Sequence, residues 1–321
     1  MAEIVVTYGV PADGFRILKE QGHTVHIAPE GEHYSCEALF ELLPAADAVV
    51  ACKAFTREMI EVAPNLKLIV CYGAGYDSID VAAATERGVM VANTPDCVTA
   101  PTAELAIALL MALARRLTYF NQKVRTMPPA DLFVMGKYMG TSLEGATLGI
   151  VGMGRIGGKV ADFGRLMGMR VVYNARTPKP ARDALGDQRV SLEALMVQSD
   201  FVSLHCPSTP ETRHLISREM IGLMKPTAYL INTARGPVLD EEALIDALKA
   251  GRLAGAALDV YTGEPNVNPA FFELEQVLLT PHVGSNTLHA RNQMAEAASQ
   301  RILAVLAGKQ PENLINPEAL R

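Results

Sequence analysis

Short apolar runs alternate with longer amphipathic stretches along most of the 321-residue chain. The short runs are rich in β-branched residues, which is typical of strands that are buried on both faces. The longer stretches repeat apolar residues every three or four positions, as helices with one buried face do. This alternation predicts an α/β fold in which helices cover parallel sheets.

The first third of the chain contains five predicted strands. They are EIVVTY, TVHIA, ADAVVAC, LKLIVCY and GVMVAN, with helical stretches such as ADGFRILKEQ and REMIEVA between them. A long helix is predicted from about Thr99 to Phe120, and Pro101 is tolerated in its first turn. The next segment, TMPPADLFVMGKYMGTSLEG, contains paired prolines and several glycines and is expected to form a loop or arm.

A second series of predicted strands begins at ATLGIVG. Its members are TLGIV, RVVYN, DFVSLHC, AYLINT, AGAALDV and VLLTP. Roughly six such strands with helices between them make a complete doubly wound nucleotide domain. The last amphipathic helix, HARNQMAEAASQRILAVLAG, is expected to return to the first domain. We therefore predict two Rossmann-like doubly wound lobes, with a dinucleotide-binding lobe (99–287) inserted into a discontinuous substrate lobe (1–98 and 288–321) and the active site between them.

Composition narrows the class of protein. Apolar residues make up 49% and charged residues 20%, as in globular proteins, and the net charge of -6 argues against a nucleic-acid surface. The longest apolar block, LAIALLMALA, is shorter than the ~20 residues of a membrane span and predicts a buried helix. The N-terminus MAEIVVTYGV lacks the basic region of a secretory signal. We expect a cytoplasmic protein with neither a nucleic-acid nor a membrane partner.

The cysteines point to a reducing compartment. No two of them form a C-x-x-C pair, and their spacing suits neither a zinc site nor a disulfide framework. The sequence therefore predicts no metal site. The five are Cys36, Cys52, Cys71, Cys97 and Cys206.

A glycine-rich turn, GIVGMGRIGG, separates the strand TLGIV from a helix. Gly152, Gly154 and Gly157 form G-x-G-x-x-G, and Arg155 and Ile156 lie between the last two glycines. In this context the first glycine permits a tight turn, the second lets the backbone approach a pyrophosphate, and the third allows close helix–strand packing. Because the helix N-terminus also favours negative charge, the motif predicts a dinucleotide site.

The second strand of this unit ends unusually, in VVYNARTPKP. A carboxylate normally stands there and binds the 2′-hydroxyl of the adenosine ribose, but this chain has Asn174. Nothing there repels a 2′-phosphate, which Arg176 can bind as a fork, aided by the Thr177 hydroxyl and by Lys179. Basic residues also outnumber acidic ones between residues 152 and 189. The stretch predicts NADP(H) in preference to NAD(H), with NAD(H) still possible; the alternative is that Arg176 is a solvated loop residue.

Three pieces downstream, LINTARGPVLD, YTGEP and LLTPHVGS, each follow a predicted strand and supply Arg235, Glu264 and His282. Taken singly, each residue also has a structural interpretation, as a surface ion pair, a turn cap or a loop hydrogen bond. Together they match the needs of hydride transfer to a 2-oxo acid. An arginine holds the substrate carboxylate in two-point geometry, and a histidine donates the proton near neutral pH. A glutamate on the far ring nitrogen stabilises the imidazolium and orients it.

At these residues the chain resembles the D-isomer-specific 2-hydroxyacid dehydrogenases. The resemblance covers essentially the whole chain, including MKPTAYLINTARGPVLDEEAL, ALDVYTGEP, TPHVGS, LGIVGMGRIG and NLKLIVCYGAGYDSIDVAAATERGVMVANTP. It implies that Arg235 binds and polarises the substrate, that His282 is the acid/base and that Glu264 is its partner. It also implies a D-configured product.

The resemblance implies further contacts for both ligands. The backbone of Gly73, Ala74 and Gly75 would bind the substrate carboxylate together with Arg235 and His282. The remaining cofactor contacts would lie at the ends of the second-series strands; they are Cys206 and Pro207 (with His205 beside them), Thr233, Ala234, Asp259 and the stretch from His282 to Gly284.

Two departures from the family pattern stand out. The residue Asn174 replaces the Asp of many members, so the chain resembles the NADPH-using glyoxylate/hydroxypyruvate reductase branch. The chain also contains no Trp, although the arm after the long helix often holds one in this family, so Phe133 and Tyr138 would have to supply that packing. The family usually dimerises through the long helix and the arm, and we expect a homodimer.

The substrate stays open at this point. By resemblance, glyoxylate and hydroxypyruvate lead, and 2-ketogluconate-like sugar acids, D-lactate chemistry and phosphoglycerate follow. Lys53 in ACKAFT is a candidate for contact with the distal end of a longer substrate, although its position is more simply explained as that of a solvated lysine. A non-enzymatic dinucleotide-sensing protein on the same fold is the alternative of another class, since fold alone does not determine function.

Overall fold

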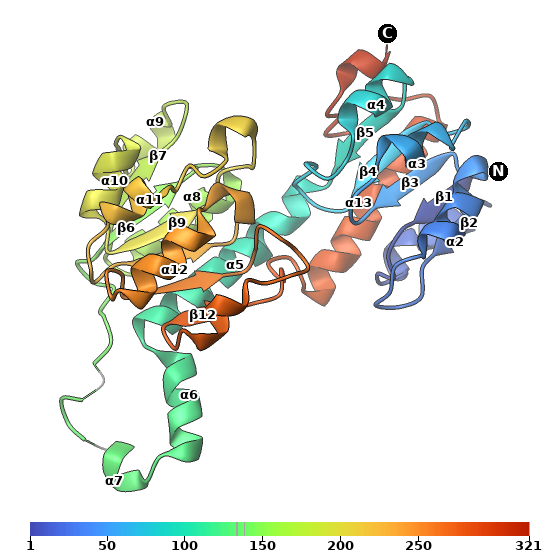
Figure 1. Ribbon diagram of the computed structural model, residues 1–321. Helices are drawn as coiled ribbons and strands as arrows, with labels where there is room; N and C mark the ends of the chain where they lie inside the picture. The colour runs from blue at the N-terminus through green and yellow to red at the C-terminus, as the bar shows by residue number, and fades with distance from the viewer. Residues whose placement is uncertain (133, 138, 321) are drawn as a thin grey trace. The chain divides into compact units, whose positions relative to one another are not determined.

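The computed structural model describes residues 1–132, 134–137 and 139–320. They divide into two compact units, Met1–Thr99 with Ser285–Arg321 and Ala100–Gly284. The sequence predicts divisions after residues 98 and 287, and the substrate and cofactor roles of the two units stay predictions. Each unit contains its own parallel sheet, which confirms the predicted α/β class with two doubly wound lobes (Figure 1).

The first unit, hereafter unit 1, is built on a five-stranded parallel sheet with the order β2–β1–β3–β4–β5. Its strands are β1 (Glu3–Val6), β2 (Thr24–Ile27), β3 (Ala48–Ala51), β4 (Leu68–Cys71) and β5 (Met90–Asn93). Successive side chains of a strand enter different cores. In β1, Ile4 and Val6 join the apolar cluster that includes α13 (Leu288–Leu306), whereas Val5 joins the cluster on the opposite face. Because both faces are covered, the central strands β3 and β4 are continuous apolar runs.

Short helices cover both faces of this sheet. They are η1 (Asp13–Phe15), α1 (Arg16–Glu20), α2 (Cys36–Leu42), η2 (Leu43–Ala45), α3 (Arg57–Glu61), α4 (Val81–Glu86) and η6 (Pro317–Leu320). Ser35, Thr56 and Asp80 cap α2, α3 and α4 through side-chain oxygens that accept backbone N–H groups. The long helix α13 packs within unit 1, with Ala295 and Ile302 in the same cluster as Phe15.

The second unit, unit 2, contains a seven-stranded parallel sheet with the order β12–β11–β10–β9–β6–β7–β8. Its strands are β6 (Thr147–Val151), β7 (Arg170–Asn174), β8 (Gln188–Arg189), β9 (Phe201–Leu204), β10 (Tyr229–Asn232), β11 (Gly255–Leu258) and β12 (Val277–Leu279). The strand order reverses between β6 and β9, and α/β proteins bind ligands at the carboxyl ends of the strands beside such a point. The sequence predicted six of these strands and missed β8, because two residues at a sheet edge leave no apolar pattern.

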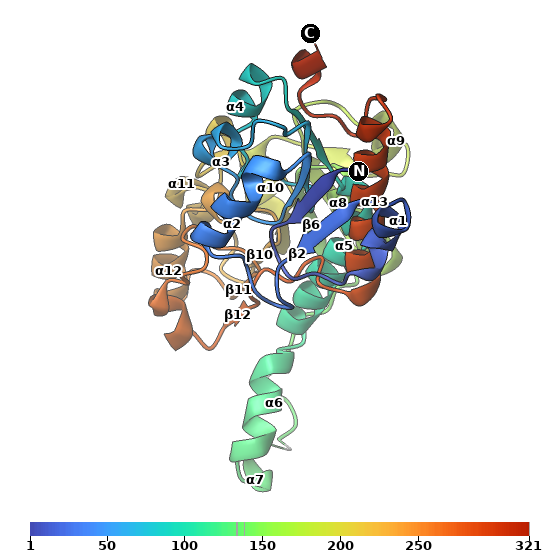
Figure 2. The same cartoon turned by 90° about the vertical axis from the view of Figure 1, so that its right-hand side faces the viewer.

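The helices of unit 2 lie on both sides of its sheet (Figures 1 and 2). They are α5 (Pro95–Ala114, which starts in unit 1), α6 (Leu117–Thr126), α7 (Pro129–Leu132), α8 (Arg155–Leu166), α9 (Pro180–Asp183), α10 (Leu192–Gln198), η3 (Pro210–Thr212), α11 (Arg218–Gly222), η4 (Gly236–Val238), α12 (Glu241–Lys249) and η5 (Pro269–Glu273). Within the described residues, α5 alone is long and apolar enough to cross a membrane, and 50% of its apolar window is buried. Leu109, Leu110 and Leu113 pack in the core of unit 2, so α5 is a core helix.

The predicted helix from Thr99 to Phe120 is in fact two helices. Arg116 adopts a left-handed conformation with φ 51°, which ends the path of α5 and starts α6 in a new direction. The arm predicted as a loop also contains α7. Figures 1 and 2 both show α6 and α7 extending away from the rest of unit 2. Phe133 and Tyr138, expected to pack in this arm, lie outside the described residues.

Candidate active site

The three glycines of the turn after β6 meet different surroundings. At Gly152, where φ is 98°, a Cβ would lie 2.6 Å from the backbone nitrogen of Cys206. At Gly157 a Cβ would lie 2.3 Å from the carbonyl oxygen of Gly152. At Gly154 a Cβ would have no neighbour within 4 Å, and no side chain caps the first turn of α8, which contains Arg155 and Ile156. The protein's own packing therefore requires the first and third glycines, while the second leaves open space for a pyrophosphate at a helix N-terminus.

The end of β7 presents an amide where a carboxylate is expected. Asn174 donates its Nδ2 hydrogen to the carbonyl oxygen of Val190 at 3.1 Å. Arg176 and Thr177, which follow, are exposed. Hydrogen bonds from Thr209 and from its own backbone lower the pKa of Glu211 in η3. The charge of Arg176 lowers this pKa further, so Glu211 lies within the electrostatic reach of Arg176. The loops after β7 and β9 therefore face each other across the end of the sheet.

The basic surplus between residues 152 and 189 is smaller in the structure than in the sequence. Arg165 and Arg182 both pair with Asp162 and Asp187, and the Asp187 carboxylate is completely buried. These two arginines are therefore neutralised inside the fold and offer little attraction to a phosphate. They therefore add little to the local surplus of positive charge that the sequence contains between residues 152 and 189.

The loop after β9 packs against the glycine turn. The His205 ring is buried and shares a 2.8 Å hydrogen bond between Nε2 and Ser203 Oγ. Burial lowers the pKa of His205 to about 3 and raises the pKa of the Cys206 thiol to about 11. Both groups are uncharged at neutral pH, so this wall of the turn is apolar in character. The cofactor contacts assigned to Cys206 and Pro207 stay predictions.

Arg235 follows β10 in a turn that Asn232 closes. The buried Asn232 side chain donates to the Arg235 carbonyl oxygen at 3.1 Å and accepts the Ala234 N–H at 3.0 Å. The next residue, Gly236, lies so close to Tyr261 that a Cβ would fall 2.0 Å from its carbonyl carbon. This close approach brings the loop of Arg235 against the loop that leads to Glu264. The Thr233 hydroxyl is buried and has no hydrogen-bond partner among the described residues, as expected of a group kept for a ligand.

Glu264 and His282 form the pair that the sequence predicts. His282 Nδ1 lies 2.8 Å from Glu264 Oε2, and the second carboxylate oxygen accepts the Tyr261 N–H at 2.9 Å. Burial alone would raise the pKa of Glu264, but the hydrogen bonds from His282 and Tyr261, with the charges of His282 and Arg235, lower it. The glutamate is therefore a carboxylate throughout the neutral range. It lies within the electrostatic reach of both other predicted catalytic residues.

The backbone at His282 is held in an uncommon conformation. Its φ is 53°, in the left-handed region that few residues other than glycine occupy. The buried carboxylate of Asp259 holds the turn by accepting the N–H groups of Val283 at 2.8 Å and Gly284 at 2.9 Å and the Thr280 hydroxyl at 2.7 Å. Asp259 and Gly284 thus support the histidine, and their cofactor contacts stay predictions. Sequence reasoning missed this support because it depends on backbone atoms.

The predicted substrate loop of unit 1 follows β4 and has an ordered backbone. The carbonyl oxygens of Gly73 and Ala74 accept hydrogen bonds from Thr94 N–H at 2.8 Å and Asn93 Nδ2 at 2.7 Å. Because a trans peptide directs its N–H opposite to its C=O, the N–H groups of Ala74 and Gly75 point away from those partners. The Gly73 N–H already donates to Cys71 at 2.9 Å, which leaves Ala74 and Gly75 as the better anion donors.

Other parts of unit 1 suit an oxo acid less well. A cavity of about 670 Å³ is lined by Asp13, Glu20, Asp96 and Glu296, which would repel an anion. Its one arginine, Arg16, is paired with Glu20 at 3.2 Å.

Within the described residues no group of three or more His, Cys, Asp or Glu side chains could hold a metal ion.

Known proteins resemble this chain over its full length. Residues 107–284 match the D-isomer specific 2-hydroxyacid dehydrogenase, NAD binding domain. A glyoxylate reductase of Thermococcus litoralis is 41% identical over 324 residues, covering 99% of this chain and 98% of that protein. The crystal structure of the TT0316 protein from Thermus thermophilus has 40% identity and a TM-score of 0.91, covering 98% of this chain and 99% of that one.

A third relative was solved with ligands. It is the NADPH-dependent glyoxylate/hydroxypyruvate reductase from Sinorhizobium meliloti in complex with NADP and malonate, with 28% identity and a TM-score of 0.85, covering 99% of this chain and 97% of that one. The glycine turn of unit 2 and its open helix N-terminus fit the dinucleotide site that such a similarity requires. The chain therefore belongs to the D-isomer specific 2-hydroxyacid dehydrogenase family and is an NAD(P)-dependent enzyme of that family.

Proposed function

We propose that the protein reduces glyoxylate and related small 2-oxo acids such as hydroxypyruvate, with NADPH as the preferred cofactor. The observation that carries this proposal is the 2.8 Å pair of His282 Nδ1 and Glu264 Oε2, within the electrostatic reach of Arg235. Similarity to glyoxylate reductases over the whole chain supports the substrate class.

The chemistry follows from the orientation of the histidine. Glu264 holds Nδ1, so Nε2 of the imidazolium is the nitrogen that donates a proton to the substrate carbonyl oxygen. NADPH, when bound, supplies the hydride to C2, which completes the alcohol. The Arg235 guanidinium binds the substrate carboxylate and stabilises negative charge on the carbonyl oxygen. A second contact of that carboxylate with the Ala74 and Gly75 N–H groups stays our prediction.

The preference for NADPH rests on the loop after β7. Asn174 brings no negative charge, and the exposed Arg176 side chain makes no hydrogen bond or ion pair within the described residues. A guanidinium that makes no such contact can bind a 2′-phosphate through two parallel hydrogen bonds. The reductase from Sinorhizobium meliloti, whose structure contains NADP, supports this choice by analogy.

The test compares initial rates with NADPH and NADH, using glyoxylate and hydroxypyruvate as substrates. Wild-type enzyme should oxidise NADPH faster at equal cofactor concentration. Arg176→Ala should raise the KM for NADPH about tenfold or more, because a charge-assisted hydrogen bond is lost, and leave the KM for NADH within about twofold. Arg218→Ala, which removes an exposed arginine paired with Asp246 at 2.8 Å, is the matched control. Faster oxidation of NADH by the wild type would reject the cofactor assignment.

We also propose that the protein is a homodimer joined through α6, which is the end of the predicted long helix, and through the arm that follows it. Apolar side chains on α6 and the arm are exposed, among them Leu117 at 55%, Val124 at 64% and Met139 at 78%. Contact with a second copy of the chain would bury them. Light scattering should therefore show twice the monomer mass, and Val124→Glu should lower it; a monomeric wild type would reject the proposal.

A further inference from the structure

The backbone of the loop formed by residues 175–179 is fastened at both ends. At its start, the Arg189 guanidinium donates to the carbonyl oxygen of Ala175 at 2.9 and 3.2 Å and to that of Arg176 at 3.1 Å. At its end, the Lys179 N–H donates to the Tyr173 hydroxyl at 3.2 Å. The two side chains that make these hydrogen bonds belong to neighbouring strands near one edge of the sheet, Tyr173 to β7 and Arg189 to β8. These hydrogen bonds within the protein define the backbone path of the loop.

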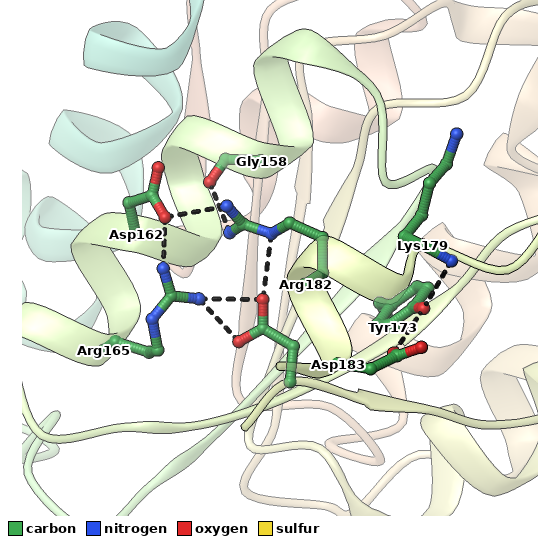
Figure 3. A network of polar contacts seen from close by, with 8 residues as sticks. Gly158, Asp162, Arg165, Tyr173, Lys179, Arg182 and Asp183 are labelled. Carbon is green, nitrogen blue, oxygen red and sulfur yellow. Dashed lines mark hydrogen bonds and ion pairs between the residues drawn. The ribbon is translucent and has the colours of Figure 1, made fainter. Parts of the chain in front are cut away.

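The Tyr173 hydroxyl is held by a second hydrogen bond. It donates to Asp183 Oδ1 in α9 at 2.7 Å while it accepts the Lys179 N–H (Figure 3). The tyrosine is fully buried, and burial followed by the Asp183 hydrogen bond raises its pKa, so the hydroxyl keeps its proton and remains a donor. A buried hydroxyl with one donor and one acceptor partner has a fixed orientation.

Arg182 ties α9 to the helix that begins at the glycine turn. It donates to the Gly158 carbonyl oxygen at 2.8 Å, to Asp162 at 2.8 Å and to the buried Asp187 at 3.0 Å (Figure 3). All three guanidinium nitrogens are therefore engaged within the protein, and Arg182 is a structural residue rather than a phosphate ligand. By fixing α9, it also fixes the position of Asp183 relative to α8.

We propose that Tyr173 and Asp183 are positioning residues for cofactor discrimination, because they hold the loop so that Arg176 and Lys179 present their positive charges to the 2′-phosphate of NADPH. This inference rests on the proposed preference for NADPH. Figure 3 shows the Lys179 side chain directed away from Tyr173 and Asp183, outside the network of pairs. Binding to a loop that is already ordered avoids the entropy cost of ordering it, which raises affinity.

The first test removes the hydroxyl alone. Tyr173→Phe should raise the KM for NADPH about three- to tenfold, the range expected for one neutral hydrogen bond, and leave kcat and the KM for NADH within about twofold. Asp183→Ala should act in the same direction. Asp183→Asn, which keeps an oxygen to accept from Tyr173, is the rescue variant and should bind NADPH no more weakly than the wild type does.

A double-mutant cycle separates positioning from general damage. If Tyr173 acts through Arg176, then Tyr173→Phe should not change the ratio of the two KM values further once Arg176→Ala is present. Equal rises of both KM values, or a lower melting temperature with an unchanged ratio, would overturn the positioning role alone. If Arg176→Ala itself leaves the ratio unchanged, the proposed NADPH preference fails, and this inference fails with it.

Discussion

The most direct test of the proposed chemistry replaces Glu264 by glutamine. The carboxylate accepts one hydrogen bond from His282 at 2.8 Å and one from the Tyr261 N–H at 2.9 Å. Glutamine has a similar shape but only one accepting oxygen and no charge, so it can keep one of these bonds and cannot stabilise an imidazolium. The change should therefore act on the proton donor while leaving Arg235 and the glycine turn in place.

The size of the effect follows from the geometry of the pair. Hydrogen bonds to charged groups contribute about 1.5–3 kcal/mol and neutral ones about 0.5–1.5, so the charge contributes about 1–1.5 kcal/mol. The His282 and Glu264 side chains are 46% and 35% exposed, and screening by water favours the lower end of that range. A difference of about 1.4 kcal/mol corresponds to a factor of ten, or one pH unit.

The assay is the pH profile of kcat/KM for glyoxylate reduction. Because reduction needs a protonated donor, the rate falls on the alkaline side, and in Glu264→Gln this fall should begin at a pH lower by up to about one unit. Glu241→Gln is the matched control, since its carboxylate accepts the Thr262 N–H of the same loop at 2.6 Å without a contact to His282. If the alkaline limb of Glu264→Gln coincides with that of the wild type, Glu264 does not assist the donor and the assignment is wrong.

Four further substitutions test other parts of the protein. His282→Ala should lower kcat by about 10² or more, and a near-normal kcat would exclude it as the acid. Gly154→Ala should keep the melting temperature and weaken cofactor binding, because the added Cβ meets no protein atom within 4 Å. Gly157→Ala should lower the free energy of unfolding by about 1–3 kcal/mol, because its Cβ would lie 2.3 Å from the Gly152 carbonyl oxygen. Equal stabilities of the two variants would contradict this reasoning. Burial lowers the pKa of His205 from its ordinary value of 6.5 to about 3 in the folded protein. Below pH 6.5, His205 therefore binds a proton in the unfolded chain but not in the folded chain. Stability should therefore fall as the pH drops through that value, and His205→Asn should reduce the loss between about pH 7.5 and pH 5.5 by about 1 kcal/mol in urea unfolding followed by circular dichroism.

Much of the fold is readable in the sequence because it depends on local patterns. The apolar runs predicted every strand of both sheets except β8, since a parallel strand buried on both faces has few polar residues. The glycine turn could be located because its three glycines have distinct steric reasons, which the surroundings of Gly152, Gly154 and Gly157 illustrate. The approach of Glu264 and His282 could also be expected, because both follow neighbouring parallel strands, whose carboxyl ends lie on one edge of the sheet.

The missed features depend on contacts that have no local pattern. The break between α5 and α6 arises at Arg116, a residue that rarely adopts the left-handed conformation found there. The two-residue strand β8 has no apolar alternation, yet its Arg189 fastens the loop after β7. Residue type and spacing give no signal for either feature: β8 exists through its pairing with β7, and an arginine does not by itself indicate a left-handed backbone.

The loop after β7 shows why charge counted along a sequence is a weak guide to a phosphate site. The sequence offers many basic side chains there, but Arg165 and Arg182 neutralise the buried Asp187, and Arg189 bonds to backbone carbonyl oxygens. These cations are engaged in maintaining the shape of the loop. The charge that remains for a ligand is set by residues such as Arg176, whose side chain makes no hydrogen bond or ion pair among the described residues, while the paired arginines determine where that charge is held. Cofactor preference in this protein should therefore respond to two kinds of substitution, those that remove Arg176 and those that release the loop that carries it.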